Sequence, residues 1–277
     1  MIISNYVMSV ILVAVVLLVL VVALAFDRKR SRRRRQALGL AWLQSMALML
    51  ARVQQHRGLS NGFLNGSVEL NHQIKPLQLR IQRDISDIES QDDWILSSRS
   101  WISLKSHWGS LSNDYSDKTA EDNLAEHNHL IQNFLYLIDD MAQAHGLLLL
   151  GEREQPLQLL WRELLTAAEY IGQARAMGTG ISAQGRCDSV SRIRLNYLCE
   201  KINQHCDSVW RDLKLDHKHK VAVVKLLECV QQDILLERIN IEPAAFFEIA
   251  TSAIDTLLQQ YQALVEHMQL SMGTKVA

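Results

Sequence analysis

Two short segments of the chain share one arginine followed by small residues. The first reads Val-Gln-Gln-His-Arg-Gly-Leu-Ser-Asn-Gly at 53–62, and the second reads Ile-Gly-Gln-Ala-Arg-Ala-Met-Gly-Thr-Gly at 171–180. Aligned without gaps, they agree at a β-branched residue, a glutamine, an arginine (Arg57 and Arg175), a Leu or Met, and a closing glycine. Such internal similarity predicts two structurally equivalent elements.

The two arginines indicate anion binding. A guanidinium group presents five N–H donors in a planar fork, which matches a flat oxyanion such as nitrate, nitrite or a carboxylate. If the two segments pack face to face, Arg57 and Arg175 hold one such anion between them. Burying two like charges without an anion is costly, so the empty site should be less stable or packed differently. The alternative is that both arginines are exposed and the small residues only allow helices to cross closely.

Glycines gather around both arginines. Seven of the twelve lie in or beside the two segments: Gly58, Gly62, Gly66, Gly172, Gly178, Gly180 and Gly185. Glycine inside a helix costs about 1 kcal/mol relative to alanine, so these clusters need an offsetting gain. Glycines spaced by four residues form one stripe on a helix, where a ligand or another helix can approach the backbone. We therefore include Gly58 and Gly178 in the predicted binding site.

Nothing in the sequence indicates catalysis. It contains no glycine-rich phosphate loop, nucleophile elbow or paired metal ligands, so we expect no enzyme, catalytic residue, cofactor or metal. The pairs His127/His129 and His217/His219 lack the spacing of helical metal ligands, and we interpret them as solvated. The four cysteines show no CxxC spacing and are interpreted as buried thiols in a reducing compartment.

The elements that must position the arginines are predicted to be helices. Apolar residues recur every three or four positions in six stretches beyond the N-terminal region, and no alternating strand pattern occurs. The three prolines (Pro76, Pro156 and Pro243) suit helix starts. Ser97–Ala120 reads as a short helix and a loop. About eight helices are expected in antiparallel bundles, and the polar break near 151–156 divides them into two halves.

An uncharged stretch of twenty residues, Val7–Phe26, predicts one transmembrane helix, since it covers about 30 Å at 1.5 Å per residue. A signal peptide would carry its basic residues before the apolar run. Here all seven basic residues of 1–35 follow it, from Arg28 to Arg35. The positive-inside rule therefore predicts an outside N-terminus and a cytoplasmic C-terminal domain. A further contact of this basic run with anionic lipid is the alternative role we consider for it.

The part of the chain after the basic run is acidic. Residues 1–35 contain seven Lys or Arg and one Asp, which leaves 22 basic and 29 acidic residues and a net charge of −7 elsewhere. Nucleic-acid binding depends on neutralising phosphates, so we expect no nucleic acid as a partner.

The two arginine segments resemble a known family. Gln-Gln-His-Arg-Gly-Leu-Ser-Asn-Gly-Phe-Leu-Asn-Gly at 54–66 looks like the opening signature of the nitrate- and nitrite-sensing (NIT) domain of bacterial receptors, and 171–180 resembles its second arginine segment. Pro243–Asp255 resembles its closing helix. The chain departs from the family pattern at His56, where an acidic or basic residue is more usual, and at Ala176, where glycine is. These departures bear on the affinity and identity of the anion.

The resemblance implies an all-α fold in which one N-terminal transmembrane helix precedes two stacked antiparallel four-helix bundles. The anchor with its basic flank would occupy 1–35 and the sensor domain 36–272, with halves of about 36–151 and 152–272. Nitrate or nitrite would lie between the bundles, bound by Arg57, Arg175 and a late arginine. We choose Arg238 for that role, with three rivals: Arg186, Arg192 and Arg194.

The sequence thus predicts a single-pass inner-membrane sensor for nitrate or nitrite. Such domains usually precede an output module, and none is recognisable before Ala277. We therefore expect the signal to pass to a separate signalling protein or through a homodimer. The alternative is a membrane-tethered helical scaffold whose glycine faces bind a partner protein and no small ligand; an enzyme ranks third.

Overall fold

The protein is almost entirely helical in the computed structural model, which describes residues 2–91, 93–149, 157–212, 220–236 and 238–274. No strand occurs in these ranges, so the all-α prediction is confirmed for them. Pro156 and the pair His217/His219 lie outside the described residues.

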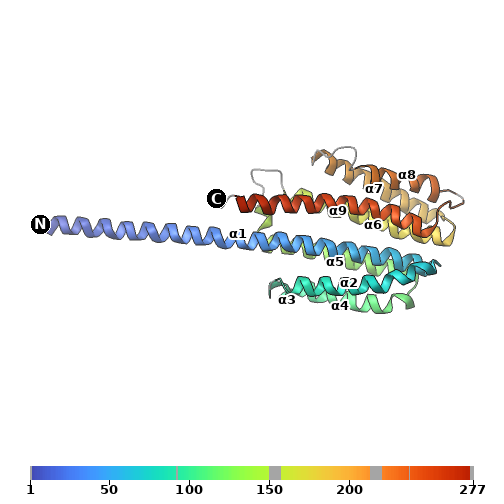
Figure 1. The fold of residues 1–277 in the computed structure, drawn as a ribbon, viewed down its shortest axis with the longest axis horizontal. Coiled ribbons are helices and arrows are strands. Elements are labelled where there is room, and N and C mark those ends of the chain that lie inside the picture. Colours follow the sequence, from blue (N-terminus) through green and yellow to red (C-terminus); the bar gives the residue numbers. More distant parts are fainter. Residues whose placement is uncertain (1, 92, 150–156, 213–219, 237, 275–277) are drawn as a thin grey trace.

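The first helix, α1, is unusually long. It spans Ile2–Leu64 without a break, which is 63 residues and about 95 Å at 1.5 Å per residue. Its N-terminal part projects from the rest of the molecule as a rod (Figure 1). Side chains from Ile11 to Phe26 are exposed, and this stretch is long and apolar enough to span a membrane. The predicted anchor therefore continues directly into the helix that carries Arg57.

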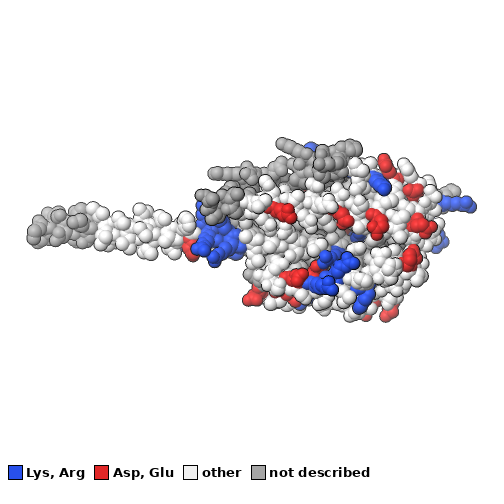
Figure 2. Space-filling view, in the orientation of Figure 1, with Lys and Arg blue, Asp and Glu red and all other residues white. Residues whose placement is uncertain are grey.

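The basic residues of α1 lie where the rod meets the body of the protein. Lys and Arg side chains gather there, whereas charges of both signs are scattered over the visible face of the body (Figure 2). Burial begins at Gln36 and Leu40, just past the basic run. The expected boundary near residue 35 therefore separates exposed from packed parts of one continuous helix.

The other helices of the described residues are shorter. They are α2 (Asn71–Glu89), α3 (Asp93–Ser97), α4 (Arg99–Asp114), α5 (Ala120–Ala144), α6 (Leu157–Gln184), α7 (Ser189–Asp212), α8 (Val221–Cys229) and α9 (Pro243–Thr274). Short 3-10 turns at Val68–Leu70, Tyr115–Asp117 and Leu147–Leu149 and a π-helical turn at Val230–Ile234 join them.

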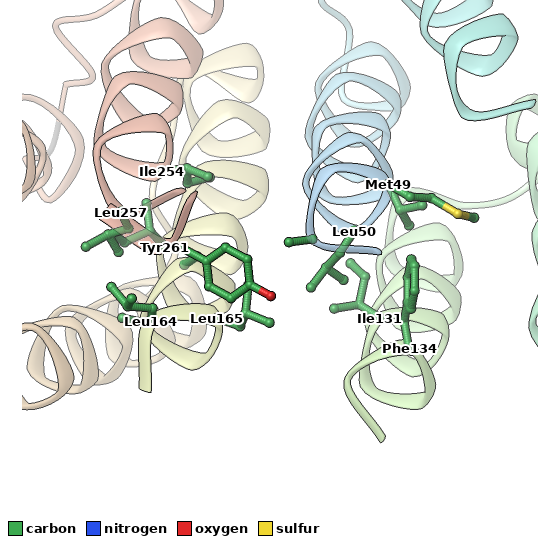
Figure 3. Close-up of a cluster of buried hydrophobic side chains, with 14 of the residues drawn as sticks. Met49, Leu50, Ile131, Phe134, Leu164, Leu165, Ile254, Leu257 and Tyr261 are labelled. Carbon is green, nitrogen blue, oxygen red and sulfur yellow. The ribbon is translucent and has the colours of Figure 1, made fainter. Parts of the chain in front are cut away.

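Helix α1 packs against α2 and α5 on one side and against α6 and α9 on the other. Figure 3 shows part of the apolar core that results, with side chains on both sides of it. Met49 and Leu50 of α1 lie with Ile131 and Phe134 of α5 on one side of this core, and residues of α6 and α9 lie on the other. Tyr261 of α9 connects the two sides, because its buried hydroxyl donates a hydrogen bond of 2.9 Å to the carbonyl of Leu43 in α1.

Two local predictions were wrong. Ser97–Ala120 is mostly the helix α4, because Trp101, Leu104, Trp108 and Leu111 repeat at helical spacing and are buried, and the Ser98 side chain accepts the Trp101 N–H as an N-cap. Pro76 lies inside α2, five residues after its start. Pro243 begins α9 as predicted.

Candidate functional site

The two arginine segments lie side by side on α1 and α6, which run parallel. Contacts between the two helices advance in the same direction along both: the Gln54 side chain donates a hydrogen bond to Glu169, and the Asn61 side chain donates one to the carbonyl of Ala176. The Asn61 amide nitrogen lies 2.7 Å from where a Cβ of Gly180 would be, and the Thr179 methyl group 2.7 Å from that of Gly62. In the alignment of the two segments, Asn61 corresponds to Thr179 and Gly62 corresponds to Gly180. The two contacts are therefore equivalent. The repeat is therefore also a repeat in space.

Arg57 is fully buried and has a carboxylate partner. Its Nη1 donates to Glu169 Oε1 at 2.7 Å and to Asn128 Oδ1 at 2.6 Å, and its Nη2 donates to Glu169 Oε2 at 3.1 Å. This is a bidentate ion pair of α1 with α6, with a further contact to α5. The guanidinium group of Arg57, which was predicted to bind an external anion, thus binds the carboxylate of Glu169 in this structure.

Both carboxylate oxygens of Glu169 accept hydrogen bonds. Besides Arg57, its two oxygens accept hydrogen bonds of 2.8 Å from the side-chain amides of Gln54 and Gln173. Only 8% of the residue is exposed. A buried carboxylate is stable only when paired and hydrogen-bonded in this way. Arg57 and Glu169 therefore form a neutral unit between α1 and α6.

Arg175 is buried to nearly the same degree, but no carboxylate of the described residues forms an ion pair with it. It is 2% exposed, and its Nη1 donates to the Thr251 hydroxyl of α9 at 2.9 Å. Its guanidinium carbon lies 4.8 Å from the centre of the Phe247 ring. Its Nε and Nη2 have no hydrogen-bond partner among the described residues. Burial, with a contribution from the charge of Arg57, lowers the pKa of Arg175 to about 9.

Burying such donors without acceptors is unfavourable, because each forfeits its hydrogen bonds to water. The side chain of Arg175 remains charged at neutral pH, since its pKa is still well above 7. Its two free nitrogens therefore present an unused donor edge and a full positive charge inside the protein. Arg57 Nε also lacks a partner among the described residues, but the charge of Arg57 is paired with Glu169. Arg175 therefore combines two unpartnered donors with a charge that no ion pair neutralises.

The glycines hold aromatic rings of α9 close to the arginine helices. A Cβ on Gly178 would lie 2.1 Å from the ring of Phe246, and a Cβ on Gly58 would lie 2.8 Å from the ring of Phe247 and 3.4 Å from Arg175 Nε. Gly178 thus has a packing role. Gly58 lies beside Arg175 and packs closely against Phe247.

Gly178→Ala is expected to destabilise the protein by about 1–3 kcal/mol, because the buried Phe246 ring leaves no room for a methyl group. Gly109→Ala on α4 is the matched control, since nothing lies within 4 Å of the added methyl group. It should stabilise by up to about 1 kcal/mol through helix propensity. Denaturant unfolding of both variants measures the difference; a stable Gly178→Ala variant would contradict this packing role.

The structure does not bring the late arginine to this cluster. Arg238 is exposed in the loop before α9. Of its rivals, Arg186 and Arg194 are exposed, and Arg192 is half-buried and donates to the carbonyl of Leu235. The third polar partner of the site is instead Thr251, which lies in the Pro243–Asp255 segment.

No protein-family model, curated protein or solved structure matches this chain. The chemistry of the site therefore rests on its geometry. Two buried guanidinium groups and one buried carboxylate leave one positive charge, which a single monovalent anion would neutralise. Among the described residues, no group of three or more His, Cys, Asp or Glu is arranged to hold a metal ion.

A second buried polar cluster begins at His56, the neighbour of Arg57. His56 Nδ1 lies 2.8 Å from His127 Nε2, and His127 Nδ1 lies 2.7 Å from the carbonyl of Asn123. Because a carbonyl only accepts, His127 carries its proton on Nδ1 and accepts from His56 at Nε2. His56 Nε2 then accepts from Gln78 at 3.0 Å. Both rings are therefore neutral, and the interpretation of His127 as solvated was wrong.

His56 and His127 should make the protein acid-sensitive. Burial lowers the pKa of His56 to about 3 and that of His127 well below its ordinary value. In the unfolded chain both bind protons near pH 6.5, so the stability they confer is complete above that pH and is lost as pH falls toward the folded pKa. At pH 5, His56 alone should cost about 2 kcal/mol of unfolding free energy.

The measurement is denaturant unfolding at pH 7 and pH 5. Gln replacing both His56 and His127 should reduce the loss of stability between these pH values. His129→Gln is the control, because His129 lies on the same helix and is exposed. An identical pH dependence in the double variant and the wild type would show that the buried pair does not titrate in this way.

Proposed function

We propose that the protein is a membrane-anchored sensor that binds one monovalent planar oxyanion, nitrate or nitrite, beside Arg175 and between α1, α6 and α9. The observation that carries this proposal is a buried, charged guanidinium whose Nε and Nη2 have no partner in the part of the chain that the structure describes. Those two nitrogens form the edge of the fork that binds a planar oxyanion in bidentate fashion. The Arg175 guanidinium carbon lies 4.8 Å from the centre of the Phe247 ring, and Gly58 lies next to Arg175 Nε without a side chain of its own.

The resemblance to the NIT family supports the same site. The three segments that carry the resemblance are the ones that meet here: α1 with Gly58, α6 with Arg175, and α9 with Phe247 and Thr251. We further propose the arrangement of two four-helix bundles, with α1, α2, α4 and α5 in the first and α6, α7, α8 and α9 in the second. Polar contacts between α2 and α4, such as Gln78 to the carbonyl of Ser112, support the first bundle.

The scaffold alternative requires glycine faces that are free for a partner helix. Four glycines of the two segments are instead covered within the chain: Gly58 by Phe247, Gly62 by Thr179, Gly178 by Phe246 and Gly180 by Asn61. The glycine clusters therefore give the scaffold no support, and they agree better with a site built inside the protein.

The membrane anchor and its orientation are part of the proposal. We place the apolar part of α1 in the inner membrane with the helical body in the cytoplasm, because the basic residues all follow the apolar stretch. Since α1 is continuous, a change in packing at Arg57 and Gly58 has a direct connection to the membrane and to a separate signalling protein or a second copy there. A C-terminal reporter that works only after export would contradict this orientation.

Ligand binding is tested with the full chain purified in lipid nanodiscs. A ligand that binds only the folded protein stabilises it by about 2.7 kcal/mol at a hundredfold excess over Kd. Nitrate or nitrite should therefore raise the melting temperature above that in chloride at equal ionic strength. Arg80→Met, on the exposed face of α2, should behave like the wild type. Equal melting temperatures in all three salts would rule out the proposed ligand.

A further inference from the structure

The buried arginine cluster has an uneven charge balance. Its three buried ionisable side chains, Arg57, Arg175 and Glu169, are 0%, 2% and 8% exposed. Asp255 and Glu248 of α9 also act on the Arg175 charge, but both are exposed to solvent. Arg57 and Glu169 neutralise each other through a bidentate ion pair. Arg175 contributes the one positive charge that remains.

We propose that Glu169 determines the charge of the ligand: by neutralising Arg57, it leaves one positive charge in the cluster and so selects monovalent over divalent oxyanions. This inference rests on the proposed binding of an oxyanion at Arg175. It adds a specificity-determining residue that does not itself contact the ligand.

Glu169 is positioned to do this permanently. Each of its oxygens accepts two hydrogen bonds: Oε1 from Arg57 and Gln173, and Oε2 from Arg57 and Gln54. Displacing it from Arg57 would leave a buried carboxylate without its cation, which is strongly unfavourable. An entering anion therefore binds at the free edge of Arg175, and the Glu169 charge stays in place.

The Arg57 guanidinium lies along α6 between the carboxylate and the proposed ligand. Its Nη2 is 2.7 Å from where a Cβ of Gly172 would be, and Gly172 is midway in sequence between Glu169 and Arg175. Glu169 therefore lies on the far side of Arg57 from Arg175 along this helix, close enough to contribute to the electrostatic environment of Arg175.

A divalent anion at Arg175 would leave one uncompensated negative charge inside the protein. Burying that uncompensated charge away from water should weaken the binding of a divalent anion by at least about a hundredfold. A monovalent anion makes the cluster neutral and incurs no such penalty. The same charge count predicts how substitutions at Glu169 and Arg57 change the selectivity.

The test is calorimetric titration of the full chain in nanodiscs with perchlorate, sulfate and nitrate at constant ionic strength. Perchlorate and sulfate are both tetrahedral with four oxygens but differ in charge, so their affinity ratio isolates charge from shape. The wild type should bind perchlorate more tightly than sulfate by about a hundredfold. Glu169→Gln raises the net charge of the cluster to two positive charges. The affinities for perchlorate and sulfate should then differ by no more than about threefold.

Two further variants complete the charge series. Arg57→Gln brings the cluster to zero, and nitrate binding should weaken by about a hundredfold. The double variant Arg57→Gln/Glu169→Gln returns it to one positive charge and should recover both nitrate binding and the preference for perchlorate over sulfate. Glu163→Gln, which removes the same charge from the partly exposed Glu163–His205 pair between α6 and α7, should leave the ratio unchanged.

The outcomes separate this inference from the proposed function. If the wild type binds none of the three anions, the proposed function fails and the inference with it. If the wild type binds nitrate but Glu169→Gln retains the full preference for perchlorate over sulfate, only the inference is overturned. If Glu169→Gln does not fold, loss of nitrate binding in the double variant overturns it.

Discussion

Replacing Arg57 with methionine should destabilise the protein by about 3–5 kcal/mol, although methionine fills much of the same volume. The substitution leaves Glu169 buried among Gln54 and Gln173 without a cation. Asn128 Oδ1 loses its hydrogen bond as well. The destabilisation therefore comes mainly from the carboxylate that remains rather than from the arginine that is lost.

The double variant Arg57→Met/Glu169→Met separates these two contributions. Removing both members of a buried ion pair in favour of apolar side chains of similar size is often close to neutral. The double variant should therefore be more stable than Arg57→Met, which is a large departure from additivity between contacting residues. Denaturant unfolding of wild type, both single variants and the double variant measures it. Additive effects would show that Arg57 and Glu169 do not stabilise each other.

The parts of the fold that depend on helical periodicity could be predicted from the sequence. Apolar spacing predicted the all-α class, and the repeat of Arg57 and Arg175 predicted two equivalent segments that proved to be adjacent parallel helices. The same periodicity could have identified His127, because Asn123, His127, Leu130 and Phe134 lie on one buried stripe of α5. A histidine on an apolar stripe is buried whatever its neighbour in sequence is.

The difference between the two arginines was not predictable from their local sequences. It depends on the packing of α1 against α6, which places Glu169 beside Arg57 and leaves Arg175 beside Phe247 and Thr251. One signal was present: Glu169 is a lone charge between Ala168 and Ile171, both of them buried. An acidic side chain on an apolar face requires a buried cation, and the two arginines of the repeat were candidates for it.

Arg175→Met should have the opposite pattern to Arg57→Met. Its charge has no carboxylate in contact, so removing it leaves only the Thr251 hydroxyl without its donor. The unliganded protein should be as stable as the wild type or slightly more stable, since an uncompensated buried charge is removed. Nitrate affinity should fall by about a hundredfold, because a charged hydrogen-bonding partner contributes about 2–3 kcal/mol.

Arg175→Lys distinguishes a planar fork from a simple positive charge. Lysine retains the charge but offers a compact ammonium group instead of two parallel donors, so nitrate binding should remain at least about tenfold weaker than in the wild type. Arg83→Lys, on the exposed face of α2, is the control and should bind normally. Calorimetric nitrate titrations and unfolding of each variant give affinity and stability together. Wild-type affinity in Arg175→Met would place the anion elsewhere, and a large loss of stability without ligand would show that the Arg175 charge is already compensated inside the protein.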